Sequence, residues 1–184
     1  MCRVSNPSER RRSVVLGIHP FAPELCPMRN YARMMQLADE VFAMHEDPTQ
    51  LQVDQEVLAH LRRLHPATVG ERADADGPVA WVLLIPTTAA LMEAFVAGKL
   101  TEQALYERTP VDAKYDAVYL CSAMVLEEHR RSGLAKQLTL DALERIRKDH
   151  PITSLFCWPF TAGGDALAGI IAKEAGLPLR MRAR

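Results

Sequence analysis

The fold of this chain is decided by residues 118–143, VYLCSAMVLEEHRRSGLAKQLTLDAL. An apolar run that ends at Val125 predicts a strand, and a short charged link then leads to a small-residue turn around Gly133. An amphipathic helix is expected to start directly after the turn. This order gathers unbonded backbone N–H groups at the positive end of a helix dipole, which suits a pyrophosphate group. Gly133 also removes the Cβ where the backbone would approach such a ligand.

The turn carries a resemblance to a known family. Residues 130–135, Arg-Arg-Ser-Gly-Leu-Ala, match the signature (Gln/Arg)-x-x-Gly-x-(Gly/Ala), and in this the chain resembles the GNAT superfamily of acyl-CoA-dependent N-acetyltransferases. Val125 lies eight residues before Gly133, where family members usually carry the valine that ends the fourth strand. The resemblance covers residues 116–179, and the earlier residues match only in the order of their elements.

The resemblance implies an α/β, GNAT-like fold. It predicts a central, mostly antiparallel mixed sheet of six to seven strands, flanked by helices. Residues 13–184 are expected to form this single domain, because 184 residues suffice for one full core, and residues 1–12 are expected to be disordered.

Hydrophobic periodicity predicts the remaining elements. Strands are expected at residues 13–18, 67–72, 78–86 and 152–158, and helices at residues 28–42, from Asp47-Pro48 to Leu64, at 87–98, at 101–108 and in a last helix that Gly176 closes. The helices within residues 87–110 form an insertion before the motif strand, where the family usually has a short turn. The insertion fits a lid or substrate wall and equally a dimer surface or scaffold packing.

Composition excludes several classes of protein. The chain has 22 Lys and Arg against 23 Asp and Glu, a net charge of -1, which gives no argument for a nucleic-acid partner. The arginines at 10–12 and at 180, 182 and 184 are expected to be solvated ends. No apolar run is long enough to span a bilayer, so no membrane partner is expected. The four cysteines show no zinc-ligand spacing, and Cys121 and Cys157 in apolar strands suggest buried thiols in a reducing, cytoplasmic setting.

The resemblance implies acetyl-CoA, or another acyl-CoA, as co-substrate and no metal. It assigns the pyrophosphate to backbone amides and two flanking charges, and the pantetheine arm to the end of the motif strand. An amide near Val125 would polarise the thioester carbonyl, a contact worth roughly 3 kcal/mol when well aimed. The expected cofactor contacts are Met124, Val125, Leu126, Arg130, Arg131, Ser132, Gly133, Leu134, Ala135 and Lys136.

Acyl transfer to an amine also needs a base, because an alkylamine with a pKa of about 10.4 is protonated at neutral pH. Many family members carry a carboxylate six residues before the strand-end valine, and this chain has Tyr119 there. Tyr119 and the nearby carboxylate Glu127 are the candidate catalytic residues. The tyrosine that often acts as general acid corresponds to Ala172, so the usual acid is missing.

These observations leave three functions open. The first is transfer of an acetyl group from acetyl-CoA to an amine, on a small molecule or a peptide, whose identity the sequence does not give. The second is an acyl-CoA-binding sensor without turnover, motivated by the missing acid and base. The third is a transferase for longer acyl chains. The extra helices also offer a surface for a homodimer.

Overall fold

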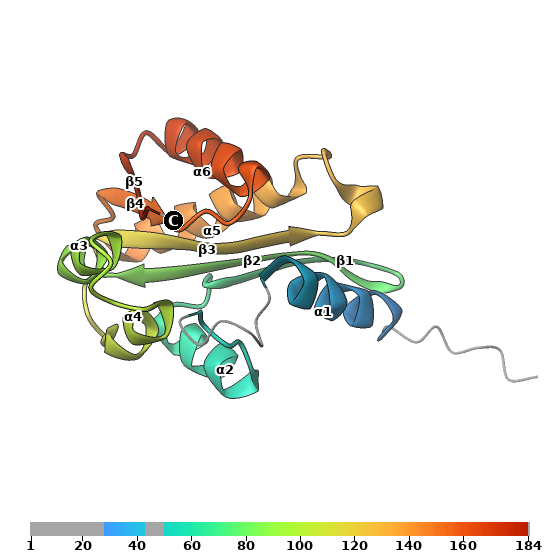
Figure 1. The fold of residues 1–184 in the computed structure, drawn as a ribbon, viewed down its shortest axis with the longest axis horizontal. Helices are drawn as coiled ribbons and strands as arrows, with labels where there is room; N and C mark the ends of the chain where they lie inside the picture. The colour runs from blue at the N-terminus through green and yellow to red at the C-terminus, as the bar shows by residue number, and fades with distance from the viewer. Residues whose placement is uncertain (1–27, 43–49, 184) are drawn as a thin grey trace, which may run out of the picture.

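The computed structural model describes residues 28–42 and 50–183. They form an α/β fold in which one mixed sheet is covered by helices on both faces (Figure 1). The predicted strand at 13–18, the helix start at Asp47-Pro48 and the expected disorder of residues 1–12 all lie outside these ranges.

The sheet is continuous across the described ranges, with its strands in chain order. The first three strands pair antiparallel, and the last two are added in parallel, giving two pairings of each kind. The antiparallel pairs join more residues than the parallel pairs do. The six to seven strands expected stay a prediction, and the structure describes five. They are β1 (Val69–Asp74), β2 (Gly77–Thr87), β3 (Ala117–Val125), β4 (Ser154–Cys157) and β5 (Leu179–Met181).

The helices predicted within the described ranges are all present. The helix predicted from Asp47-Pro48 to Leu64 begins only at Gln55, because residues 50–54 are not helical and the side chain of Asp54 caps the first turn. In Figure 1, α5 and α6 lie on one side of the sheet, and α1, α2 and α4 lie on the other. The helices are α1 (Met28–Phe42), α2 (Gln55–Leu64), α3 (Ala89–Val96), α4 (Glu102–Arg108), α5 (Leu134–Asp149) and α6 (Ala162–Ala175), with a short 3-10 helix, η1 (Glu127–His129), before α5.

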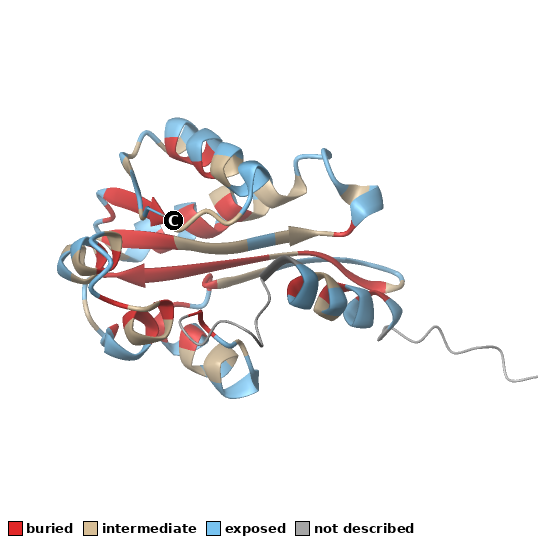
Figure 2. Ribbon diagram, in the orientation of Figure 1, coloured by how far each residue is buried: buried red, intermediate tan, exposed pale blue. Residues whose placement is uncertain are grey.

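The predicted insertion is part of the core. Burial is concentrated on β2, on the first half of β3 and on the helix faces against them (Figure 2). From α3, the fully buried Phe95 packs edge-on against Tyr119 and Phe156, with ring centroids 5.0 and 5.8 Å apart. From α4, Leu105 is fully buried in the same cluster. Of the two interpretations of residues 87–110, scaffold packing is therefore the one that these contacts support.

The expectation of a solvated arginine tail was wrong for Arg182, which is half-buried, whereas Arg180 is exposed and Arg184 lies outside the described residues. β5 pairs with β4 from Leu155 onward, and this strand carries both side chains back onto α3. Arg180 makes a two-point ion pair with Glu93, with a shortest N–O distance of 2.7 Å. The guanidinium of Arg182 stacks on the rings of Phe95 and Trp158, 4.7 and 4.4 Å from their centroids. The open edge of β4 thus gives a short, charged segment a place to pair.

Candidate functional site

The turn between β3 and α5 is held in a left-handed backbone conformation. Arg131 has a φ of 60°, and Gly133, the residue that precedes α5, has a φ of 84°. The hydroxyl of Ser132 donates back to the carbonyl of His129 inside the turn, so it does not cap the helix. No protein atom lies within 4 Å of a Cβ built on Gly133, so the protein itself requires glycine there for its backbone angle rather than for space.

The first turn of α5 lacks the cap that its neighbours have. α2, α3, α4 and α6 each begin after an Asp or Thr whose side chain accepts a hydrogen bond from a first-turn amide: Asp54, Thr88, Thr101 and Thr161. α5 begins after Gly133 and has no side-chain cap. Its first intrahelical bond is from the amide of Gln137 to the carbonyl of Gly133, 2.9 Å long. The amides of residues 134–136 therefore remain free for an anion at the positive end of the dipole.

Beside this turn, one edge of β3 is open. β3 pairs with β4 only over Ala117–Tyr119, whereas it pairs with β2 along its whole length. The amide of Leu126 donates to Val79 of β2 at 3.0 Å. Because backbone groups alternate between the two edges of a strand, the amides of Ala123 and Val125 face the opposite, unpaired edge. The side chain of Arg130 confirms this direction, since its Nε donates to the Val125 carbonyl at 3.1 Å.

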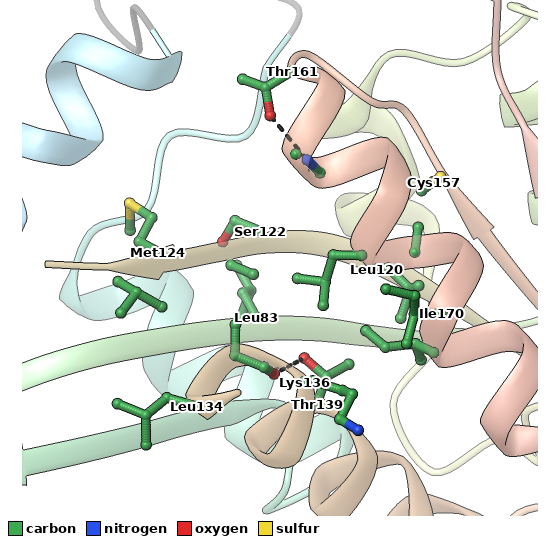
Figure 3. Close-up of a pocket in the computed structure, with 18 of the residues that line it drawn as sticks. Leu83, Leu120, Ser122, Met124, Leu134, Lys136, Thr139, Cys157, Thr161 and Ile170 are labelled. Atoms are coloured by element: carbon green, nitrogen blue, oxygen red, sulfur yellow. Dashed lines mark hydrogen bonds between the residues drawn. The ribbon is translucent and has the colours of Figure 1, made fainter. Parts of the chain in front are cut away.

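A single cavity of about 780 Å³ joins the open strand edge to the turn. It runs from residues 129–136 along β3 to the point where β3 and β4 separate, and α6 closes its far wall. Figure 3 shows Leu120, Ser122 and Met124 along β3, with Lys136 of α5 and Ile170 of α6 among the other residues that line the cavity. Trp158 and Phe160, which follow β4, line it as well.

All but one of the predicted cofactor contacts line this cavity. The exception is Leu126, which is 3% exposed and packs against Met34 and Val79, with its amide already bonded to Val79. Because the side chain of Leu126 is buried against α1 and β2, it does not reach the open edge of β3. The predicted contacts that do line it are Met124, Val125, Arg130, Arg131, Ser132, Gly133, Leu134, Ala135 and Lys136.

No family model, curated protein or solved structure matches the chain. The resemblance to the GNAT superfamily therefore rests on residues 116–179 alone.

Positive charge surrounds the turn, although part of it is paired. Lys136 forms an ion pair with Glu174 of α6 at 2.9 Å, in which both side chains are more than one-third exposed. Such an exposed pair is worth little and gives way to a stronger anion. Arg130 is held by the Val125 carbonyl, and Arg131 is exposed. Three basic side chains are thus within the same loop and first turn, as an anionic ligand requires.

The link before the turn is tied to α1. The two terminal guanidinium nitrogens of Arg33 donate to the carboxylate of Glu128, at 2.7 and 2.9 Å. This two-point bond lowers the pKa of Glu128 to about 2. Asn30, one turn earlier in α1, donates to Asp74 at the end of β1. Together these contacts fix the start of the loop that presents the free amides.

Replacing Arg33 by Ala is expected to return the pKa of Glu128 from about 2 toward its ordinary 4.5, because the carboxylate loses its two strongest donors. A carboxylate whose pKa is lower in the folded than in the unfolded protein stabilises the fold at pH values above its unfolded pKa. This contribution is lost as the pH falls from 4.5 through about 2. NMR titration of the Glu128 side chain measures the shift. Arg29→Ala, an exposed arginine of the same helix, is the control and should leave that titration unmoved.

The two predicted catalytic residues lie away from the cavity. The ring of Tyr119 is fully buried, and its hydroxyl donates to Glu102 at 2.7 Å. Burial, and then the charge of the Glu102 carboxylate, raise the pKa of Tyr119 well above 10. The phenol therefore stays neutral at neutral pH, and a neutral phenol is a poor base. Glu127 is exposed in η1 and is not among the lining residues. Ala172, at the family's acid position, is buried.

Sequence reasoning missed Glu102. This residue starts α4, inside the insertion, and only 5% of its surface is exposed. Its carboxylate lies against β3 behind the cavity wall, where it accepts from Tyr119 and Cys121. An acidic residue in a helix's first turn is usually a dipole-favoured surface group, so its position gave no signal.

Residues 28–42 and 50–183 hold no cluster of His, Cys, Asp and Glu suited to a metal ion. Among the helices of those ranges, none has the length and apolar character that crossing a bilayer requires.

Proposed function

We propose that the chain is an acyl-CoA-dependent N-acyltransferase with a GNAT-like fold, which transfers acetyl from acetyl-CoA directly to an amine. One observation carries the proposal: the uncapped first turn of α5 and the unpaired edge of β3 open into the same cavity. An anion site and a row of peptide donors, joined end to end, suit a ligand with a pyrophosphate at one end and an amide-containing arm.

The pyrophosphate accepts from the amides of residues 134–136, with Arg131 and Lys136 neutralising its charge. The pantetheine arm extends along β3 and pairs with its open edge as an added strand would. The amides of Ala123 and Val125 face that edge, and the one nearest the thioester carbonyl polarises it. The thioester then lies where β3 and β4 separate, beside Trp158, which lines the cavity.

The reaction itself is one displacement. The neutral amine attacks the thioester carbon, the C–N bond forms, and the C–S bond breaks as the CoA thiolate leaves. The nitrogen, which the attack leaves positively charged, loses its remaining extra proton to that thiolate, so the products are the neutral amide and the CoA thiol. The ammonium proton must be removed first, because a protonated nitrogen has no lone pair to donate. The volume of the cavity, about 780 Å³, is within the usual range for ligand pockets. Its lining includes the apolar residues Leu83 and Leu120.

One observation favours the alternative of a sensor without turnover. Among the residues that the structure describes, no Asp or Glu lines the cavity, and the only lining ionisable groups are basic residues and two cysteines. Burial and the charge of Asp165 raise the pKa of one of them, Cys157, to about 11, so its thiol is not a base at neutral pH. A domain that only holds acyl-CoA needs the amides and not the base.

The proposal predicts that acetyl-CoA and CoA raise the melting temperature. A ligand that binds only the folded state at 100 times its dissociation constant adds about 2.7 kcal/mol of stability. Differential scanning fluorimetry with acetyl-CoA, CoA and inorganic pyrophosphate measures the effect. If saturating CoA and acetyl-CoA both leave the melting temperature unmoved, the transferase and the sensor fall together.

Release of free thiol then separates the two functions. With acetyl-CoA and a panel of amines that includes polyamines, aminoglycosides and peptides, a transferase produces CoA thiol at a rate that depends on the amine. A sensor shows the same melting shift and releases no thiol with any of them.

A further inference from the structure

Glu102 is a buried carboxylate that the proposed chemistry does not yet use. It belongs to α4 of the insertion and faces β3 where that strand carries a bulge. At the bulge, Cys121 has no Cα partner on β2, because Leu120 and Ser122 pair with consecutive residues of that strand. Bulges interrupt a ladder and re-aim a side chain, which here is the thiol of Cys121.

The donors around Glu102 indicate its charge state. One carboxylate oxygen, Oε1, accepts from the Tyr119 hydroxyl at 2.7 Å and from the Cys121 thiol at 3.4 Å. The other, Oε2, accepts from the amide of Leu51 at 2.7 Å. Three donors and no acceptor surround the group, an environment for an ionised carboxylate rather than for a carboxylic acid.

The ionisable groups that face this carboxylate come from several elements of the described chain. They are Tyr119 and Cys121 on β3, with Cys157 of β4 behind Tyr119, and Arg182 after β5. Burial raises the pKa of Glu102, and the bonds from Leu51, Tyr119 and Cys121, with the charge of Arg182, oppose that rise. The group is therefore a stronger base than an exposed glutamate while remaining ionisable.

Cys121 connects Glu102 to the cavity. Its residue lines the cavity wall, and its thiol donates to the carboxylate behind that wall. One thiol thus separates the buried carboxylate from the space assigned to the thioester and the amine. Glu102 is the only carboxylate that the structure records in contact with a lining thiol of this wall. A neutral glutamine side chain could also hold α4 against β3 by hydrogen bonds. Burying a carboxylate costs more free energy than burying such an amide, so anchoring alone does not explain Glu102.

We propose that Glu102 accepts, through Cys121, the proton that the acceptor ammonium loses. The inference rests on the proposed transferase function. The Cys121 thiol passes its proton to Oε1 of Glu102 as its sulfur takes one from the ammonium, which becomes a neutral amine. Glu102 is then a carboxylic acid. As the C–S bond breaks, the second proton of the attacking nitrogen goes to the CoA thiolate, and the proton on Glu102 returns through Cys121 to solvent. No redox partner is needed.

The experiment is a pH profile of kcat/KM for acetyl-CoA-dependent thiol release with the best amine of the panel. Glu102→Gln is expected to lower kcat by about 100-fold or more and to remove the acidic limb of the profile, without changing the melting shift caused by acetyl-CoA. Tyr119→Phe removes one donor to the carboxylate and should move that limb to higher pH. Glu107→Gln, an exposed glutamate on the same helix, is the matched control and should match the wild type.

The relay is tested at Cys121. Cys121→Ala should lose rate as Glu102→Gln does, and Cys121→Ser, which restores a hydroxyl donor, should recover at least tenfold over Cys121→Ala. If Glu102→Gln does not fold, the comparison of Cys121→Ala with Cys121→Ser still tests the proton relay. The proton-transfer role is overturned if Glu102→Gln and Cys121→Ala fold and keep their rates within threefold. It is also overturned if the wild type binds acetyl-CoA but releases no thiol with any amine, whereas a missing melting shift rejects the proposed function itself.

Discussion

Gly133→Ala is expected to abolish the rise in melting temperature that acetyl-CoA causes. At a φ of 84° an Ala costs the free protein roughly 1–2 kcal/mol, because its Cβ clashes with its own backbone, and no neighbouring protein atom adds to that. The larger effect is on the ligand. If the backbone at residue 133 shifts to relieve this strain, the amides of residues 134–136 no longer point at one anion. The added methyl group also occupies space beside the proposed pyrophosphate. Loss of at least 100-fold in affinity is the expected result, measured by calorimetry.

Gly98→Ala is the matched control for this variant. Gly98 ends α3 with a φ of 73°, and like Gly133 it has no protein atom within 4 Å of a built Cβ. It does not line the cavity. The two variants should therefore lose similar stability in urea denaturation, and only Gly133→Ala should lose the acetyl-CoA effect. Equal binding by both would show that the turn does not hold the ligand.

Phe95→Ala is expected to lower the free energy of unfolding by about 3–5 kcal/mol, the usual range for deleting a buried aromatic ring. The ring is fully buried and contacts the rings of Tyr119, Phe156 and Trp158 as well as the guanidinium of Arg182. Its loss leaves a cavity between the insertion and the strands that carry the site. Urea denaturation followed by tryptophan fluorescence and circular dichroism measures the change.

Val111→Ala serves as the control, since Val111 follows the insertion and is 37% exposed, and it should change stability by less than about 0.5 kcal/mol. A loss under 1 kcal/mol for Phe95→Ala would mean that residues 87–110 open independently of the rest. In that case the insertion would act as a lid, the alternative that its packing does not support.

The strand, turn and helix around Gly133 could be predicted from sequence because each is a local signal. The apolar run to Val125, the glycine and the amphipathic spacing that follows specify their elements within a few residues of one another. The residues predicted to contact a cofactor could be placed from the same turn, since the prediction uses main-chain groups whose direction the elements fix. Leu126 does not line the cavity, because its amide continues the pairing with β2.

Glu102 and β5 could not be predicted, because both depend on contacts between distant parts of the chain. Glu102 meets Tyr119 across 17 residues and Leu51 across 51, and no spacing rule relates such positions. β5 is three residues long, carries an arginine at its centre and is a strand only because β4 offers it an edge. The sheet's strand count and its parallel half depend on that late pairing in the same way.

The uncapped start of α5 also bears on how this chain can change over generations. Where recognition uses amide hydrogens, the path of the backbone carries the specificity, and a residue such as Ser132 is free to drift. The two left-handed positions of the turn, Arg131 and Gly133, resist exchange more. A lineage that kept this path could replace most of the surrounding side chains and still present the same free amides, so amino-acid identity would fade long before the geometry of the turn was lost.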